Sequence, residues 1–167
     1  MILSLLILTF PALVIYAAIS DVMSMTISNK VSLGLVASFV VVALAMGMPW
    51  TAIGWHFAVG FVVLVAGIAC FAMGWIGGGD AKVAAAIALW MGTADTMTYL
   101  AISSGIGGLL TLALLSMRAQ PLPEWALRQA WIARLYDPKN GVPYGVALAA
   151  GALVVFPGTP WMVGTVL

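Results

Sequence analysis

Charge is what this sequence has least of. Six Lys or Arg and five Asp or Glu residues occur among 167, with a net charge of +1, whereas 64% of the residues are hydrophobic. This balance excludes an ordinary soluble domain, in which about a quarter of the residues are charged. There is no tract of basic residues, so nothing favours nucleic acid as a partner. The composition predicts an integral membrane protein whose partner is the lipid bilayer.

Cysteine and histidine are nearly absent as well, with one residue of each kind. A single cysteine, Cys70, excludes an intrachain disulfide and a multi-cysteine zinc site, so we expect it to act as a small buried apolar residue. The single histidine, His56, has no neighbouring ligand in the sequence, and we expect a structural role for it. No cofactor and no metal site is predicted.

Long apolar runs without strict alternation favour helices over a membrane barrel. We predict an all-α polytopic protein, residues 1–167 forming one transmembrane domain. Its spans are expected at about 2–19, 31–46, 53–74, 81–92, 97–116 and 142–164. The first run resembles a signal peptide in length, but it lacks a basic start and a clear cleavage site, so it is interpreted as a true span. Residues 92–95 are expected to form a loop.

Residues 117–141 form the longest polar connection. Apolar side chains recur there at near-helical spacing between charges, which predicts an amphipathic helix on the cytoplasmic surface of the membrane. These apolar residues are Trp125, Leu127, Trp131, Ile132 and Leu135.

The basic residues fix the expected orientation. Each span carries the chain to the other side of the membrane, so the first, third and fifth connections between spans lie on the same side. All six basic residues fall in these connections: Lys30, Lys82, Arg118, Arg128, Arg134 and Lys139. The positive-inside rule makes that side cytoplasmic. Both termini are then periplasmic, in a bacterial inner membrane. Asp21 ends the first span and Asp80 begins the fourth, so both are expected at the cytoplasmic edge.

The stretch from Gly77 to Lys82 is the most informative one. Gly77, Gly78 and Gly79 deliver Asp80 to the start of an apolar segment, and a carboxylate at membrane depth is a functional candidate by default. We expect the glycines to adopt backbone conformations closed to other residues and to leave space beside the carboxylate. The fourth span, of a dozen residues, rises only about 18 Å against a hydrocarbon core of roughly 30 Å, which places Asp80 close to membrane depth.

Two carboxylates at one depth can act together. If Asp21 and Asp80 approach within hydrogen-bond reach, they share a proton, and one can take a proton from water while the other polarises a peptide carbonyl. This is the chemistry of an aspartic protease, and it needs no cofactor. The pair would titrate as a unit, so the base and the acid are not assigned.

These motifs resemble those of the type IV prepilin peptidases, the bacterial branch of the GxGD intramembrane aspartic proteases. The similarity lies in three stretches: residues 19–30, with Ile19-Ser20-Asp21 and Thr26-Ile27-Ser28-Asn29-Lys30; residues 77–82, with Gly77-Gly78-Gly79-Asp80-Ala81-Lys82; and residues 143–147, with Pro143-Tyr144-Gly145-Val146-Ala147. The resemblance implies that Asp21 and Asp80 are catalytic. The short peptidases of Flp (tight-adherence) pili are the most similar subgroup, and Ser28 stands where many members have proline.

The resemblance also implies the substrate. A prepilin or pseudopilin precursor carries a short basic leader that ends in glycine and precedes an apolar helix, and the pilus assembly machinery is a further expected partner. Long-form relatives add a region with paired cysteine motifs and methylate the product. This sequence has neither, so we expect peptidase activity without N-methyltransferase activity.

The supporting residues are open to two interpretations. Lys82 either fixes orientation or lies near the aspartates, and Asn29 is either a cap or a part of the site. Two other functional classes remain as alternatives. In a small ion-coupled transporter the aspartates would bind a cation, but such sites usually lie at the midplane within an internal repeat. A non-catalytic subunit of a pilus or secretion machine differs only in the effect of mutating the aspartates.

Overall fold

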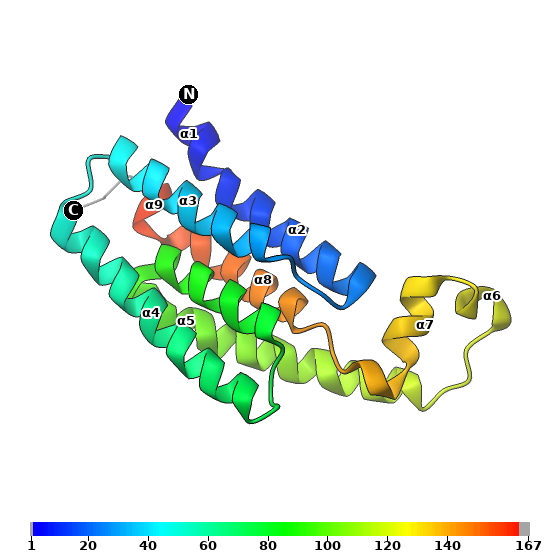
Figure 1. The fold of residues 1–167 in the computed structure, drawn as a ribbon. Helices are drawn as coiled ribbons and strands as arrows, with labels where there is room; N and C mark the ends of the chain where they lie inside the picture. The colour runs from blue at the N-terminus through cyan, green and yellow to red at the C-terminus, as the bar shows by residue number, and fades with distance from the viewer. Residues whose placement is uncertain (1, 164–167) are drawn as a thin grey trace.

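The structure, a computed structural model, describes residues 2–163 as a set of helices, and no strand occurs in that range (Figure 1). The helices, in chain order, are α1 (Ile2–Ile7), α2 (Thr9–Ser24), α3 (Asn29–Ala45), α4 (Trp50–Ala72), α5 (Gly78–Arg118), α6 (Glu124–Leu127), α7 (Ala130–Tyr136), η1 (Pro138–Asn140), α8 (Tyr144–Val155), η2 (Phe156–Gly158) and α9 (Pro160–Val163). The predicted all-α class is confirmed for this part of the chain.

The long helices run side by side along one axis (Figure 1). α6 and α7 lie at one end of this bundle, and α1 and α9 lie at the other. The last turn of α2, the first turn of α5 and the first turn of α8 all lie towards the α6–α7 end. Residues from three distant parts of the sequence therefore meet there.

Three helical stretches are long and apolar enough to cross a membrane: Leu5–Ser24, Trp50–Ala72 and Gly78–Arg118. Two shorter apolar helices, Asn29–Ala45 and Tyr144–Gly158, accompany them. The count of six spans stays a prediction.

The chain reverses at one residue inside α5. Gly92 has φ 66° and ψ −165°, and its neighbours on both sides are helical. Residues 78–91, the first arm, and residues 93–118, the second arm, lie side by side and line a common cavity. The prediction of a loop over 92–95 was wrong, because one glycine in the left-handed region makes the reversal and the helix resumes at Thr93. Space requires this glycine too, since a Cβ there would lie 2.6 Å from the His56 ring.

An aromatic core fills the half of the bundle near α1 and α9. Trp90, at the end of the first arm, is fully buried, and its indole N–H donates to the Leu35 carbonyl at 2.9 Å. Trp161 donates in turn to the Trp90 carbonyl at 2.6 Å. These bonds satisfy the polar edge of each buried indole, which apolar surroundings would otherwise penalise. His56 forms a similar bond through Nδ1 to the Leu89 carbonyl, at 2.6 Å.

Small residues bring α4 against the first arm. A Cβ added at Gly60 would lie 3.2 Å from the Ala85 carbonyl oxygen, and one at Gly67 would lie 2.9 Å from the Ala81 Cβ. Backbones that approach this closely are typical of helices packed in a membrane.

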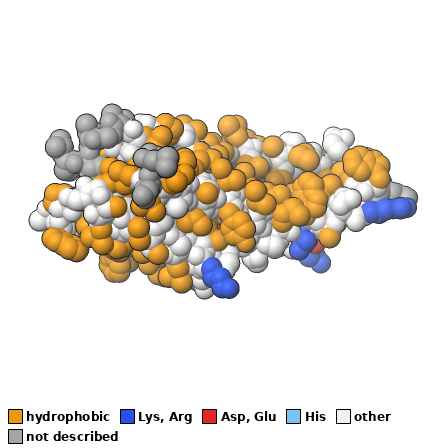
Figure 2. Space-filling view, turned by 90° about the horizontal axis from the view of Figure 1, so that it is seen from above, with side chains coloured by type: hydrophobic (Ala, Val, Ile, Leu, Met, Phe, Trp, Pro, Cys, Tyr) orange, Lys and Arg blue, Asp and Glu red, His pale blue; other side chains and the backbone are white. Residues whose placement is uncertain are grey.

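The surface of the bundle is apolar. Large side chains such as Leu33, Phe61, Val62, Leu109 and Leu112 are between 64% and 69% exposed. Figure 2 shows apolar side chains over much of the face in view, and the basic ones lie from its middle towards the α6–α7 end. A contiguous apolar surface of this extent is a liability in water and the expected surface in lipid. The chain is a membrane protein.

The polar connection after α5 differs from its prediction. The second arm continues to Arg118, and the expected amphipathic helix is divided into the short helices α6 and α7. Trp125 is 70% exposed and contributes little to the fold. Arg118 anchors the connection instead: its guanidinium donates to the Leu135 carbonyl at 2.6 and 2.8 Å and to the Gly141 carbonyl at 2.6 Å.

Candidate active site

Asp21 lies in the last turn of α2, and it is 5% exposed. The helix extends past the predicted end of the first span and stops at Ser24, where Met25 takes a left-handed conformation (φ 54°). The Met25 N–H donates to the Asp21 carbonyl at 2.7 Å. The backbone of Asp21 is thus fixed by a helix terminus, and its side chain points into the protein.

Gly145, in the first turn of α8, holds the Asp21 carboxylate. Its backbone N–H donates to Asp21 Oδ2 at 2.7 Å, a short distance typical of a hydrogen bond to a charged acceptor. A Cβ at position 145 would lie 2.8 Å from the same oxygen and 2.7 Å from Ile27 Cδ1. Only glycine fits here without moving the carboxylate.

Asp80 is the third residue of α5, and it is partly buried. Its carboxylate turns back over the start of the helix, where Oδ2 accepts from the Gly77 N–H at 3.3 Å. This is the return half of a capping box, and it satisfies a backbone donor that a helix start leaves unpaired. A Cβ at Gly77 would lie 2.8 Å from that oxygen.

Of the three glycines, Gly77 is required for space, and none is required for backbone conformation. The glycines with positive φ in the described chain are Gly47, Gly74, Gly92 and Gly141, so the expectation that residues 77–79 need unusual dihedral angles was wrong. Gly77 makes room for the carboxylate, whereas a Cβ at Gly78 or Gly79 would make only ordinary contacts, at 3.4 Å from Phe71 and 3.5 Å from Ile27.

The structure brings Asp21 and Asp80 to one neighbourhood. Ile27, in the loop between α2 and α3, lies close to the backbone beside each aspartate. A Cβ at Gly79, which precedes Asp80, would lie 3.5 Å from Ile27, and a Cβ at Gly145, which bonds Asp21, would lie 2.7 Å from Ile27 Cδ1. Two carboxylates in one neighbourhood of an apolar bundle are suited to proton transfer.

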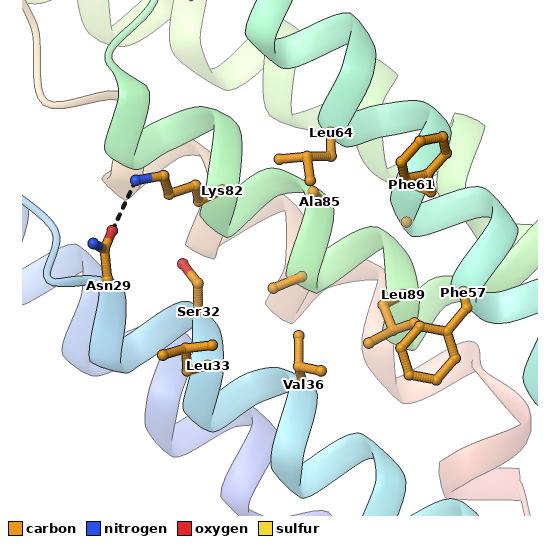
Figure 3. A pocket seen from close by; sticks show the side chains of 12 residues that line it. Asn29, Ser32, Leu33, Val36, Phe57, Phe61, Leu64, Lys82, Ala85 and Leu89 are labelled. Atoms are coloured by element: carbon orange, nitrogen blue, oxygen red, sulfur yellow. Dashed lines mark hydrogen bonds between the residues drawn. The ribbon is translucent and has the colours of Figure 1, made fainter.

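Lys82 and Asn29 lie together, away from Asp80. The Lys82 Nζ donates to Asn29 Oδ1 at 2.9 Å, at one end of an apolar cavity of about 470 Å³ between α3, α4 and the first arm (Figure 3). Neither aspartate lines this cavity. Asp80 lines a second cavity, of about 390 Å³, which lies between α8 and the two arms of α5.

A comparison with protein families decides the affiliation. The model of the type IV leader peptidase family matches residues 8–112. The chain belongs to this family. Searches among curated proteins and among solved structures give no significant match. Both Asp21 and Asp80 lie within the stretch that matches the type IV leader peptidases.

Gly145 and Ile27 belong to this neighbourhood, although sequence reasoning gave neither of them a role in the site. Both lie in stretches that carry the family resemblance, residues 143–147 and 19–30. For Gly145, counting spans also places the start of its predicted span at the same edge as the aspartates. For Ile27, the resemblance was the available signal, because an apolar residue in a short loop has no pattern that marks it as part of a site.

Proposed function

We propose that this member of the type IV leader peptidase family is an aspartic endopeptidase in which Asp21 and Asp80 form the catalytic pair. One observation carries the proposal. Asp21 from α2 and Asp80 from α5 lie in one neighbourhood at one end of an apolar bundle, both near Ile27, and each accepts a hydrogen bond from a backbone N–H. A buried carboxylate is costly in such surroundings, so a pair of them indicates function rather than packing.

The proposed mechanism is the addition of water to a peptide carbonyl. The ionised aspartate takes a proton from water as the water oxygen bonds to the carbonyl carbon, and the protonated aspartate gives its proton to the carbonyl oxygen. The resulting tetrahedral diol collapses as the C–N bond breaks: the protonated aspartate gives its proton to the leaving amine, and a diol hydroxyl gives a proton to the ionised aspartate, which leaves a carboxylic acid and restores the pair. The Gly145 and Gly77 N–H groups fix the positions of the two carboxylates, which preorganises the site before substrate enters.

The proposed substrates are prepilin and pseudopilin precursors, of the Flp type in particular, cut between the leader and the apolar helix. The site would lie at the cytoplasmic face of a bacterial inner membrane, with both termini periplasmic. The basic residues support this placement, because Lys82, Arg118 and the residues of α7 lie towards the same end of the bundle as the aspartates. The proposal covers peptide hydrolysis and no methyl transfer.

The test is cleavage of a co-expressed Flp-type prepilin by the wild type, Asp21→Asn and Asp80→Asn, read as a gel shift. Each substitution keeps the shape of the side chain and removes its acid–base function. We expect no mature product from either variant at normal membrane levels of the protein. Normal processing by either one would refute the mechanism and favour a non-catalytic assembly subunit. Mass spectrometry of the wild-type product also tests for a methyl group at its new amino terminus.

A further inference from the structure

The cavity that Asp80 lines opens on the lipid-facing surface. Its walls come from the two arms of α5, from α8 and from Trp75 and Ile76, which precede the glycine turn. Trp75, Ser104 and Gly108 on its rim are exposed, so the cavity is a groove and not a closed pocket. We call it the Asp80 groove. Its volume of about 390 Å³ is within the usual range of ligand sites.

The second arm presents small residues on two adjacent faces. On the inner face, Gly107 packs on α8, because a Cβ there would lie 3.4 Å from Tyr144 and 3.5 Å from Ala147. On the outer face, Ser104 and Gly108 are spaced four apart, so they lie one above the other. A Cβ at Gly108 would meet nothing within 4 Å. The outer face has the small-xxx-small pattern that lets another helix approach closely, and no described residue covers Gly108.

Ser103 lines the groove but does not offer it a free hydroxyl. The residue is 4% exposed, and its Oγ faces α8, where a Cβ at Gly151 would collide with it. The groove therefore presents small side chains, and not a hydrogen-bond donor, to an occupant on this side.

We infer that the Asp80 groove receives the first turns of the apolar helix that follows the scissile bond of the substrate. The inference rests on the proposed function, because a substrate cut beside Asp80 must enter the membrane from there. One end of the groove is marked by Gly107 and Tyr144, which contact each other beside the Asp21–Gly145 pair. The other end is marked by Leu100, seven residues before Gly107 on the second arm, a separation of about 10 Å at 1.5 Å per residue. The groove thus accommodates about two helical turns, with the substrate helix parallel to α8.

The larger cavity beside Lys82 is a weaker site for this helix. It lies between α3, α4 and the first arm, and it is not lined by either aspartate (Figure 3). A substrate helix seated there would not continue directly from a bond held at Asp80. The two cavities therefore predict different contacts for the same substrate.

The first experiment narrows the groove by substitution. Gly108→Leu fills its outer face, and Gly105→Leu is a matched control. Gly105 is also exposed on α5, a Cβ there also meets nothing within 4 Å, and it does not line the groove. Leucine favours a helix over glycine at both positions. We expect Gly108→Leu to raise KM for prepilin by about tenfold with little change in kcat, the signature of lost binding, and Gly105→Leu to leave both unchanged.

The second experiment maps the contact between the groove and the prepilin in a variant that does not cleave it. A photo-crosslinking residue is placed at position 104, 105 or 33 in the Asp21→Asn variant, which is then reconstituted in bilayers with prepilin. We expect a prepilin adduct from position 104 and little from the other two. An adduct from position 33, beside Lys82, and not from 104 would overturn the inference, and so would adducts to lipid alone at 104. If the wild type does not cleave prepilin but position 104 still gives a prepilin adduct, the proposed function is refuted and the groove remains a binding site for prepilin.

Discussion

Replacing Gly145 by alanine tests the geometry of the site most directly. The added Cβ would lie 2.8 Å from Asp21 Oδ2, 2.7 Å from Ile27 Cδ1 and 3.0 Å from Asp21 Cβ. Ordinary contacts begin near 3.4 Å, so Asp21, Ile27 or the start of α8 must move by about 0.5 Å or more. Misplacing a catalytic group by about 1 Å can cost about 100-fold in rate, or about 2.7 kcal/mol in the activation free energy.

Overpacking also destabilises a fold, by about 1–3 kcal/mol, so the activity assay needs a packing control. Gly60→Ala is that control, because its Cβ would lie 3.2 Å from the Ala85 carbonyl and from Leu89 Cβ, with no carboxylate nearby. The assay is the initial rate of prepilin cleavage by purified protein in bilayers, with the thermal midpoint measured on the same samples. We expect both variants to lose some stability, and only Gly145→Ala to lose about 30- to 100-fold in kcat/KM.

Two results would refute this reasoning. One is a Gly145→Ala variant with wild-type kcat/KM, because Asp21 would then tolerate a displacement that the proposed mechanism forbids. The other is an equal loss of activity in Gly60→Ala and Gly145→Ala, because the effect would then follow stability and not the position of the carboxylate.

Three further perturbations test the surroundings. Gly92→Ala places a side chain at φ 66° and against the His56 ring, so we expect a loss of about 1–3 kcal/mol in stability from backbone strain alone, measured by denaturant unfolding and partly relieved in a Gly92→Ala/His56→Ala double variant. Lys82→Gln is expected to lower cleavage only a few-fold, because its amine bonds Asn29 and not Asp80; a loss as complete as that of Asp80→Asn would contradict this placement. Arg118→Ala removes the bonds to the Leu135 and Gly141 carbonyls, so we expect faster proteolysis between residues 119 and 143, and Arg118→Lys, which lacks the planar fork, should not restore protection.

Counting spans from the sequence placed Asp21 and Asp80 at one edge, and the bundle has them at one end. The expectation rested on long apolar runs being helices in lipid and on each crossing changing sides; the number of crossings and the side that the aspartates face stay predictions. The direction of Lys82 was also within reach of the sequence. Residues two apart on a helix differ by about 200° around its axis, so Asp80 and Lys82 face opposite sides, and the structure has them in different cavities.

Other features depend on contacts that no local pattern records. Gly92 reverses the chain without a loop because its φ is positive, and His56, from another helix, occupies the space where a side chain would be. Gly145 is required by the position of a carboxylate 124 residues earlier. Residues 121–137 have near-helical spacing of apolar side chains, but the chain divides into α6 and α7 at Gln129, whose backbone is extended (φ −85°, ψ 112°). Arg118 bonds the end of this connection, at the Leu135 and Gly141 carbonyls.

The bond between Asp21 and Gly145 has a consequence for biosynthesis. Asp21 is synthesised before its hydrogen-bond donor, which follows 124 residues later. During this interval the carboxylate lacks its backbone donor, so the nascent protein holds an incomplete site while it enters the membrane beside other newly made proteins. Under the proposed mechanism, hydrolytic competence arrives only with α8. A chain ending at residue 141 is expected to insert and to leave prepilin uncut, and co-expression of residues 142–167 as a separate segment is the direct measure of whether that last helix completes the enzyme.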